Sequence, residues 1–454
     1  MPLEVIIIGG GLSGALLANG LLTHGSPSIN VTVYERETTT NAREGYQIRL
    51  GQAALIGMRS CLPDSLKSSI CSKFGRSGGT ISSAPILYDP YTMDVSCDLS
   101  KLPDYQKSAP ISRALLRDAL QGPLIEKGVM RFGKRFVRYE IIGEAGGAGR
   151  EKVKAIFENG TEAVGDVLIT ADGATSKANV QIGLDNHRIK KNTVFWIAKS
   201  QLTVEKMATL PRELLKAPVG VAEYGIQLYM SAYLPDKPGA PPALEGEKVD
   251  FDENGAALMV ALTVPKSKYP ENLEEVENFK QYSLDNILNE FHPKIQDIVR
   301  AADDDVYLVT PRYSIPPEKN WRKKLQEKFP EDRTKGNPRV WLIGDAIHPM
   351  LPTRGMGANQ SMHDTASALP ALLSLAKNEE GATNAEVAKA VEEYEAEMIP
   401  RAFSWVKASG DGDLLQFSKL QLFIIARIMD VAGVYTWAKR MLGWVPQDQT
   451  PELR

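Results

Sequence analysis

The sequence predicts an α/β fold in which an antiparallel sheet is inserted into a nucleotide-binding unit and helices follow near the C-terminal end. Three observations support this prediction. The apolar run Val5–Ile8 leads straight into a glycine-rich turn, as expected of a parallel strand buried on both faces. Long strand-like runs follow between residues 191 and 264, and a second buried run, Val340–Ile343, comes near the end of the chain. This order favours a Rossmann-like unit whose two parts are separated by a second, sheet-based domain.

The first segment has the strand, turn, helix and strand order of a dinucleotide-binding unit. After the first strand come three glycines, residues 9–11, and then an Ala- and Leu-rich helical stretch through Leu22. A second strand, Val31–Tyr34, ends at the acidic residue Glu35. An acid at the tip of the second strand is a regular part of this unit.

Further helices and strands are expected after the first segment, and the whole chain divides into four regions. Helices are expected at residues 51–71, 112–126, 272–291, 357–376, 385–406 and 414–442. Strands are expected at 153–157, 166–170, 193–204, 219–234, 256–264 and 340–343, with a hairpin turn at Asn159-Gly160. The regions are a cofactor-binding domain at 1–185, a substrate-binding β-sheet domain at 186–310, the return of the first domain at 311–410, and a C-terminal helical region at 411–454.

Charge and composition argue against several classes of protein. The 53 Lys and Arg residues nearly balance the 56 Asp and Glu residues, and the formal net charge is −3, so no nucleic-acid partner is expected. Three cysteines do not make a disulfide framework, and the five histidines lack metal-ligand spacing, so no metal is expected. The sequence shows neither a signal peptide nor an apolar stretch of about 20 residues. We expect a cytoplasmic monomer or homodimer.

The Gly-x-Gly-x-x-Gly motif of Gly9, Gly11 and Gly14 has a mechanical purpose. Gly9 permits a tight turn, Gly11 lets a pyrophosphate approach the backbone, and Gly14 lets the helix pack close to the strand. Because the flanking strands and helix are also present, the motif predicts a bound adenine dinucleotide.

The neighbouring residues complete this half of the predicted site. The helix begins near Leu12 and Ser13, where free N–H groups and the helix dipole attract phosphates. Glu35 lies about 20 residues further on, where its carboxylate can accept hydrogen bonds from ribose hydroxyls, and Arg36 stands beside it. These features do not distinguish NAD from FAD.

A second helix start with glycines decides between the two cofactors. Asp345 follows the buried strand and Gly344, and residues 352–358 then open a helix. A nicotinamide cofactor on one Rossmann half would not need this second site, whereas the longer FAD would. Asp345 can accept a hydrogen bond from a ribityl hydroxyl, and backbone N–H groups can face the electron-poor end of the isoalloxazine ring. The residues expected to contact FAD here are Asp345, Pro352, Gly355, Met356, Gly357 and Ala358.

With these motifs, the chain resembles the FAD-dependent monooxygenases of the aromatic hydroxylase (p-hydroxybenzoate hydroxylase-like) family, and especially the tailoring enzymes of fungal secondary metabolism. The resemblance covers about residues 3 to 410 and includes a motif that begins at Arg113 and another at Ala171-Asp172-Gly173. It implies that Arg113 contacts FAD, instead of merely capping or solvating a helix. It also implies that Asp172 takes part in binding both FAD and the nicotinamide cofactor.

The chain departs from the family pattern at three positions. Asn179 stands where the Ala171-Asp172-Gly173 motif usually ends in arginine, Thr170 replaces the usual glycine before Ala171, and Met356 replaces the common glutamine. A cation that could meet the phosphates of NADPH is therefore missing from this motif. The nearest candidates to compensate are Arg43, Arg49 and Arg354.

Three further residues, Arg49, Tyr224 and Tyr229, are candidate catalytic groups. Arg49 falls in the loop that lies by the isoalloxazine in relatives, although it could also be an exposed charge. Tyr224 and Tyr229 lie on the expected substrate sheet, where each could direct a hydroxyl at a substrate or simply pack in the sheet. His348 suggests a general base, but we expect a packed or hydrogen-bonded histidine because the expected chemistry does not require an imidazole.

The C-terminal region shows an amphipathic helical pattern. Its apolar positions recur at intervals of three or four residues: Phe417, Leu420, Ile424, Ile428, Val431 and Tyr435. We expect this helix to pack on the body of the protein or on a partner subunit. Peripheral membrane binding is the less favoured alternative, since the polar face is not strongly basic.

The expected function is that of an FAD-dependent monooxygenase. The resemblance implies that NADPH or NADH reduces FAD, and that O2 then forms a C4a-hydroperoxide which transfers one oxygen atom to the substrate. The apolar strands suggest a hydrophobic aromatic or indolic natural product, to be hydroxylated or epoxidised. The alternatives are a flavin-dependent dehydrogenase or cyclase without oxygen insertion, and a non-enzymatic escort protein on the same fold.

Overall fold

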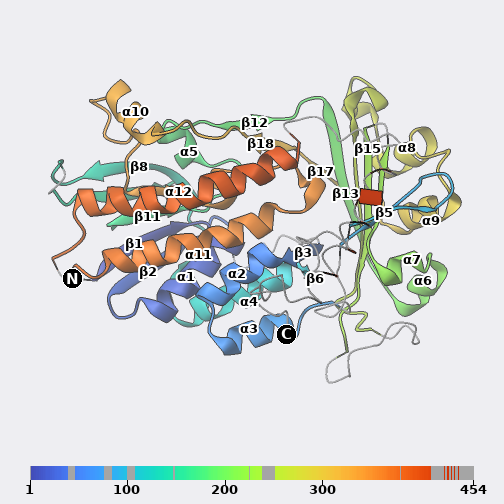
Figure 1. Cartoon of the computed structure of the whole chain (residues 1–454), viewed down its shortest axis with the longest axis horizontal. Coiled ribbons are helices and arrows are strands. Elements are labelled where there is room, and N and C mark those ends of the chain that lie inside the picture. The colour runs from blue at the N-terminus through green and yellow to red at the C-terminus, as the bar shows by residue number, and fades with distance from the viewer. Residues whose placement is uncertain are drawn as a thin grey trace.

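The computed structural model describes residues 2–38, 47–75, 84–99, 108–146, 149–223, 225–237, 251–378 and 380–410, with residues 424, 427, 428, 431, 434 and 438. It has the mixed α/β architecture that the sequence predicts, because a parallel sheet with covering helices is combined with a larger, mainly antiparallel sheet (Figure 1).

A five-stranded parallel sheet forms the centre of the first half. Its order is β19 (Val340–Leu342), β11 (Val167–Thr170), β1 (Leu3–Ile8), β2 (Ile29–Tyr34) and β7 (Met130–Arg131). The strands are short and almost entirely apolar, which suits burial on both faces. Strand β19 is separated from β1 by more than 300 residues of sequence, yet only β11 lies between them in the sheet.

Helices cover one face of this sheet and a small sheet covers the other. The helices are α1 (Leu12–His24), α2 (Gln52–Cys61), α3 (Asp64–Cys71), α4 (Arg113–Glu126), α11 (Gly357–Leu375) and α12 (Asn384–Ala408). Figure 1 shows α11 and α12 lying side by side. The small sheet consists of β8 (Phe136–Ile142), β9 (Lys152–Phe157) and β10 (Glu162–Gly165). The rings of Tyr34 on β2 and Phe157 on β9 lie 4.6 Å apart and join the two sheets.

A seven-stranded sheet forms the other end of the molecule (Figure 1). Its order is β17 (Val306–Val309), β13 (Thr193–Gln201), β16 (Ala257–Pro265), β15 (Ile226–Tyr233), β14 (Val219–Glu223), β4 (Ile86–Tyr88) and β5 (Val95–Asp98). One face packs on α8 (Phe279–Asn286) and α9 (Pro293–Ala301) around the buried Trp196. All pairs are antiparallel except that of β14 with β4.

Short elements connect the two halves or lie at their edges. Strand β3 (Gln47–Gly51) pairs with β6 (Ser108–Ser112), and β12 (His187–Ile189) pairs with β18 (Arg312–Ser314). The remaining helices are α5 (Lys177–Gln181), α6 (Val204–Thr209), α7 (Glu213–Lys216) and α10 (Trp321–Lys328).

Two predicted elements are divided in the structure, and a third is shorter than expected. The expected strand 219–234 is a hairpin of β14 and β15, because Gly225 adopts a positive φ of 81° and turns the chain. The expected helix 51–71 is interrupted at Pro63, which cannot continue α2 and serves as the N-cap of α3. The expected helix 272–291 forms only from Phe279 to Asn286, where the Asn278 side chain accepts a hydrogen bond from the Gln281 amide and sets the start.

In the C-terminal region, the described residues are helical. The side chains of Ile424, Ile428 and Val431 are 46%, 62% and 70% exposed, so these three are not packed on the body of the protein. Packing of this helix on a partner subunit stays a prediction. Phe417, Leu420 and Tyr435 lie outside the described residues. Within the part of the chain that the structure describes, helices are too short or too polar to cross a membrane.

Candidate active site

Three motif-bearing strands end at the same edge of the parallel sheet. Ile8 of β1 is paired with Thr170 of β11, which is paired in turn with Leu342 of β19. The residues that follow these strands are therefore brought to one edge, where ligands bind in open α/β sheets. The turn at Gly9, the Asp172 motif and the Gly344 motif, which are far apart in the sequence, meet there.

The glycine turn leaves the start of α1 open. The N-cap residue of α1 is Gly11, and the helix start has no side-chain cap and no acidic residue in its first turn. A Cβ atom added at Gly11 would have no atom within 4 Å, whereas one at Gly14 would lie 2.0 Å from the Gly9 carbonyl oxygen. Gly14 therefore serves the packing of α1 on β1, while Gly11 faces open space before uncapped N–H groups.

The second glycine motif lies directly beside this helix start. Gly344 has a φ of 60°, and an added Cβ would lie 3.2 Å from the Ser13 hydroxyl oxygen of α1. An added Cβ at Gly357, the first residue of α11, would lie 3.9 Å from Asp345 Oδ1. Like α1, α11 has no side-chain cap. Two uncapped helix starts and the carboxylate of Asp345 therefore converge.

The carboxylate of Asp345 is accessible although protein surrounds it. Burial raises its pKa, and the positive charges of His348 and Arg113 oppose the rise. Arg113, at the first position of α4, is thus brought close to Asp345. The Ser112 side chain does not cap the start of α4.

Glu35 is held against the glycine turn. Its Oε2 atom accepts a hydrogen bond from the Gly10 amide (2.7 Å), and Oε1 accepts one from the Glu37 amide (3.0 Å). A carboxylate can accept about four hydrogen bonds, so it keeps capacity for hydroxyl donors. The Gly10 carbonyl also accepts a hydrogen bond from the buried side chain of Gln121 (2.7 Å). Gln121 therefore supports the turn, and no sequence motif points to this role.

Asp172 belongs to the Ala171-Asp172-Gly173 motif and lies within the electrostatic influence of Arg36. Burial raises the pKa of Asp172 to about 6, and hydrogen bonds together with the Arg36 charge oppose the rise. Oδ2 accepts a hydrogen bond from the Lys177 amide (3.2 Å), whereas Oδ1 is buried without a partner among the described residues. The site therefore has an unused acceptor here.

Arg49 is buried, with 9% of its side chain exposed, and it is not the exposed surface charge that the sequence left open. Its Nη2 atom lies 3.4 Å from the Arg354 carbonyl oxygen in the loop before α11. The buried Asn359 side chain fixes this junction, because it donates to the Arg49 carbonyl (2.8 Å) and accepts from the Gly51 amide (2.6 Å). Arg43, another compensating cation considered above, lies outside the described residues.

Tyr229 meets Arg49 from the seven-stranded sheet. It lies on β15 opposite Ala261 of β16, on the face that points away from α8 and α9. Burial raises the pKa of the Tyr229 hydroxyl, and the Arg49 charge opposes the rise. Tyr224, the other candidate, lies outside the described residues. Tyr229 and Arg49 therefore mark the contact between the two halves of the molecule.

A small cavity extends this contact. It lies between strands β13 and β16 on one side and the segment before α11 on the other. Its walls are formed by Lys190, Thr193, Phe195, Thr263, Pro311, Leu351, Pro352 and Thr353. Pro352 begins a 3-10 turn that ends before Gly355, whose φ of 62° requires glycine, and the Met356 side chain is buried.

Asn179 differs in role from what the sequence suggested, whereas His348 agrees with its prediction. Asn179 is 1% exposed and donates hydrogen bonds to the Ala346 carbonyl (2.8 Å) and the Asn186 side chain (2.9 Å). It is an internal tie, not a surface position that lacks a cation. His348 is fully buried with Nε2 at 2.6 Å from Asp364 Oδ2, in agreement with the expected hydrogen-bonded histidine.

The arrangement suits an extended dinucleotide. Open space before Gly11 and the uncapped start of α1 can take a pyrophosphate. Glu35 is placed for a ribose, and Asp345 and the start of α11 can take the other end of the molecule. Groups of His, Cys, Asp or Glu suited to a metal ion do not occur among the residues that the structure describes.

Comparison with known proteins agrees with this geometry. Residues 300–409 match the family described as FAD binding domain. The dual O-methyltransferase/FAD-dependent monooxygenase elcB of Phaeosphaeria nodorum is 24% identical over 92% of this chain and 46% of its own length. The FAD-dependent monooxygenase phnB of Penicillium herquei is 24% identical over 89% of each chain. The chain spans about half the length of elcB and of the similar dual protein CTB3 of Cercospora beticola.

Solved structures share the fold. HpxO of Klebsiella pneumoniae, in complex with FAD and uric acid, has a TM-score of 0.62 at 19% identity, and the match covers 96% of this chain and 92% of that one. PqsL of P. aeruginosa, in complex with 2-aminobenzoylacetate, has a TM-score of 0.64 at 17% identity, with 95% and 100% covered. The resemblance to aromatic-hydroxylase-type flavoenzymes that the motifs indicated is confirmed.

Proposed function

We propose that this chain, which carries an FAD-binding domain and has FAD-dependent monooxygenases among its relatives, is itself an FAD-dependent monooxygenase. NADPH or NADH would be the reductant and O2 the source of one inserted oxygen atom. The observation that carries the proposal is the closeness of Gly344 to Ser13, whose hydroxyl would lie 3.2 Å from a Cβ added at Gly344, because it brings the two predicted halves of the FAD site together.

The chain's own residues divide the work of holding the cofactor. The start of α1, behind Gly11, would receive the pyrophosphate, and Glu35 would accept hydrogen bonds from ribose hydroxyls. Asp345 would accept from the ribityl chain, and Arg113 supplies a positive charge beside Asp345. The uncapped N–H groups at the start of α11 would favour negative charge on the flavin ring.

FAD, when bound, supplies the redox chemistry that the amino acids lack: it takes two electrons from NAD(P)H and makes O2 reactive toward the substrate. In the overall balance, substrate, O2, NAD(P)H and a proton give the oxygenated product, NAD(P)+ and water. The protein excludes bulk water and holds the reacting carbon in place. The buried Arg49, between the loop before α11 and the seven-stranded sheet, is suited to orient a polar group of the substrate.

The seven-stranded sheet supports a hydrophobic substrate. Its inward face carries Phe195, Ile197, Met259 and Ala261, and beside them the polar side chains of Gln227, Tyr229, Ser231 and Thr263. Apolar walls combined with a small number of polar groups are typical of small-molecule sites. We infer that the substrate is a hydrophobic aromatic or indolic compound, hydroxylated or epoxidised at an electron-rich carbon.

The test is a turnover assay with the purified protein. We expect a flavin absorption band, substrate-stimulated consumption of NADPH and O2, and a product heavier by one oxygen atom by mass spectrometry. The same assay under 18O2 should place the label in the product. Flavin reduction by substrate without label would favour a dehydrogenase or cyclase, and a protein that retains no flavin would favour the escort alternative.

A further inference from the structure

The segment from Gly344 to His348, which carries Asp345, is held from two sides by side chains that lie outside the Gly344-Asp345 motif. On one side, Asn179 donates to the Ala346 carbonyl (2.8 Å) and Asn186 donates to the Ile347 carbonyl (3.1 Å). On the other side stands Asp364 of α11. Its Oδ2 atom accepts a hydrogen bond from the Gly344 amide (2.7 Å), so it is bonded to the residue immediately before Asp345.

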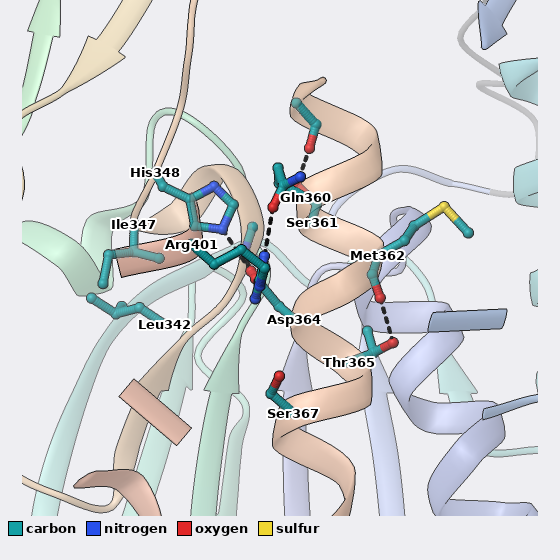
Figure 2. Close-up of polar contacts among 12 residues, drawn as sticks. Leu342, Ile347, His348, Gln360, Ser361, Met362, Asp364, Thr365, Ser367 and Arg401 are labelled. Carbon is teal, nitrogen blue, oxygen red and sulfur yellow. Dashed lines mark hydrogen bonds and ion pairs between the residues drawn. The ribbon is translucent and has the colours of Figure 1, made fainter. Parts of the chain in front are cut away.

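Asp364 also fixes the residue at the other end of this segment. The same Oδ2 atom lies 2.6 Å from Nε2 of His348, and both side chains are fully buried (Figure 2). The other ring nitrogen of His348, Nδ1, has no hydrogen-bond partner among the described residues. Asp364 is therefore the polar contact that orients the imidazole, and it spans the turn from Gly344 to His348.

The charge of Asp364 is maintained by its surroundings. Burial alone would raise the pKa of Asp364, but the charges of His348 and Arg401 outweigh it and hold the pKa below its usual value. Arg401 of α12 lies 2.9 Å from Oδ1 and is itself held by Gln360 (2.7 Å) and Glu397 (2.6 Å), as Figure 2 shows for Gln360. A buried, ionised carboxylate is costly unless it is fully partnered, as it is here.

The turn itself needs this support. Gly344 has a left-handed backbone, and it has no side chain with which to fix its own position. Its surroundings are close, since an added Cβ would lie 2.8 Å from the Ser361 hydroxyl. Small shifts at this residue would move Asp345, the next residue, away from the start of α1. Asp364 and its partners do not reach the open part of the site, so their contribution is indirect.

We propose that Asp364 is a positioning residue for the ribityl end of FAD: it holds Gly344 and His348 so that Asp345 presents its carboxylate to the cofactor. This inference rests on the proposed function, because it assumes that FAD is the ligand. It assigns to Asp364, with Arg401 as its counter-charge, a role in cofactor affinity that is exerted through the backbone turn.

The test compares two ligands in two variants of the full chain. The protein is stripped of flavin and titrated with FAD, and separately with ADP, which has the adenosine and pyrophosphate but lacks the ribityl chain. For Asp364→Asn we expect the Kd for FAD to rise about tenfold or more, because a charged hydrogen-bond acceptor is lost. The Kd for ADP should stay within about twofold, because the α1 end of the site is unchanged.

Glu397→Gln is the matched control. Glu397 binds the same guanidinium of Arg401 but does not contact residues 344–348, so both Kd values should match the wild type. If Asp364→Asn does not fold, His348→Phe removes the other partner of Asp364 and should give the same selective loss of FAD. Equal weakening of FAD and ADP, or unchanged FAD affinity, would overturn the proposal. A wild-type chain that does not bind FAD would instead overturn the proposed function.

Discussion

The side-chain amide of Asn179 donates a hydrogen bond to the carbonyl of Ala346, at 2.8 Å, although 167 residues separate them in the sequence. This bond joins the motif that follows β11 to the motif that follows β19. In this chain, position 179 therefore stabilises the architecture of the site from inside. Because position 179 is buried, it is not part of an exposed surface on which an arginine could bind a cofactor phosphate.

Asn179→Ala should destabilise the protein. The variant removes the side-chain donor to the buried Ala346 carbonyl and to Oδ1 of Asn186, which costs about 1–3 kcal/mol for each buried polar group. Urea unfolding followed by circular dichroism measures the loss. Lys177→Ala, at an exposed neighbouring position, is the control and should change little. An Asn179→Ala protein as stable as the wild type would contradict the internal-tie interpretation.

Gly11→Ala and Gly14→Ala should separate cofactor binding from folding. The added methyl at Gly11 meets open space, so stability should change by no more than about 1 kcal/mol while FAD affinity falls, because the methyl occupies the path of the pyrophosphate. The methyl at Gly14 meets the Gly9 carbonyl and should cost at least about 2 kcal/mol of stability. Thermal unfolding and FAD titration check both. Tight FAD binding by Gly11→Ala would argue against this placement of the phosphates.

Asp345→Asn should make the flavin-free protein more stable and its FAD binding weaker. Because burial raises the pKa of Asp345, the ionised form at neutral pH is disfavoured in the folded state, and removing the charge relieves this cost. FAD affinity should fall because a carboxylate is a stronger acceptor for hydroxyls than an amide. The Tm of the flavin-free protein and the Kd for FAD are the two measurements. A lower Tm with unchanged Kd would contradict the assignment.

The His348–Asp364 pair should make the flavin-free protein less stable in alkali. Asp364 raises the pKa of His348 above its ordinary value of 6.5, although burial opposes the rise. The contribution of His348 is thus fully present below pH 6.5 and is lost as the pH rises through the raised pKa. The difference in unfolding free energy between the wild type and His348→Gln should shrink as the pH rises. A difference that stays constant or widens as the pH rises would contradict this assignment.

Tyr229→Phe should affect the substrate and not the cofactor. The hydroxyl lies near Arg49 on the inward face of the seven-stranded sheet, away from α1. Loss of one neutral hydrogen bond to the substrate should raise KM about fivefold, with the Kd for FAD unchanged. Tyr233→Phe is the control, since its hydroxyl already donates to the Lys73 carbonyl at 2.6 Å. A fall in FAD affinity in Tyr229→Phe would place this residue in the cofactor site instead.

Much of the fold could be predicted from local sequence patterns. The buried runs at β1, β11 and β19 are continuous and apolar, and the glycine turn after β1 has only one common structural context. Elements were wrong where a single residue interrupts a longer pattern, as Gly225 does between β14 and β15. Periodicity reports which side chains are apolar, but not where the chain reverses.

The sequence by itself determined that a dinucleotide-binding turn, a second glycine motif and an inserted sheet are present, because each is set by residues close together in the chain. Only the tertiary structure decided which polar residues support them. Gln121, Asn179 and Asp364 act on carbonyls and amides more than 15 residues away. Such contacts depend on how strands and helices pack, and a buried polar side chain carries no periodic signal that would reveal its partner.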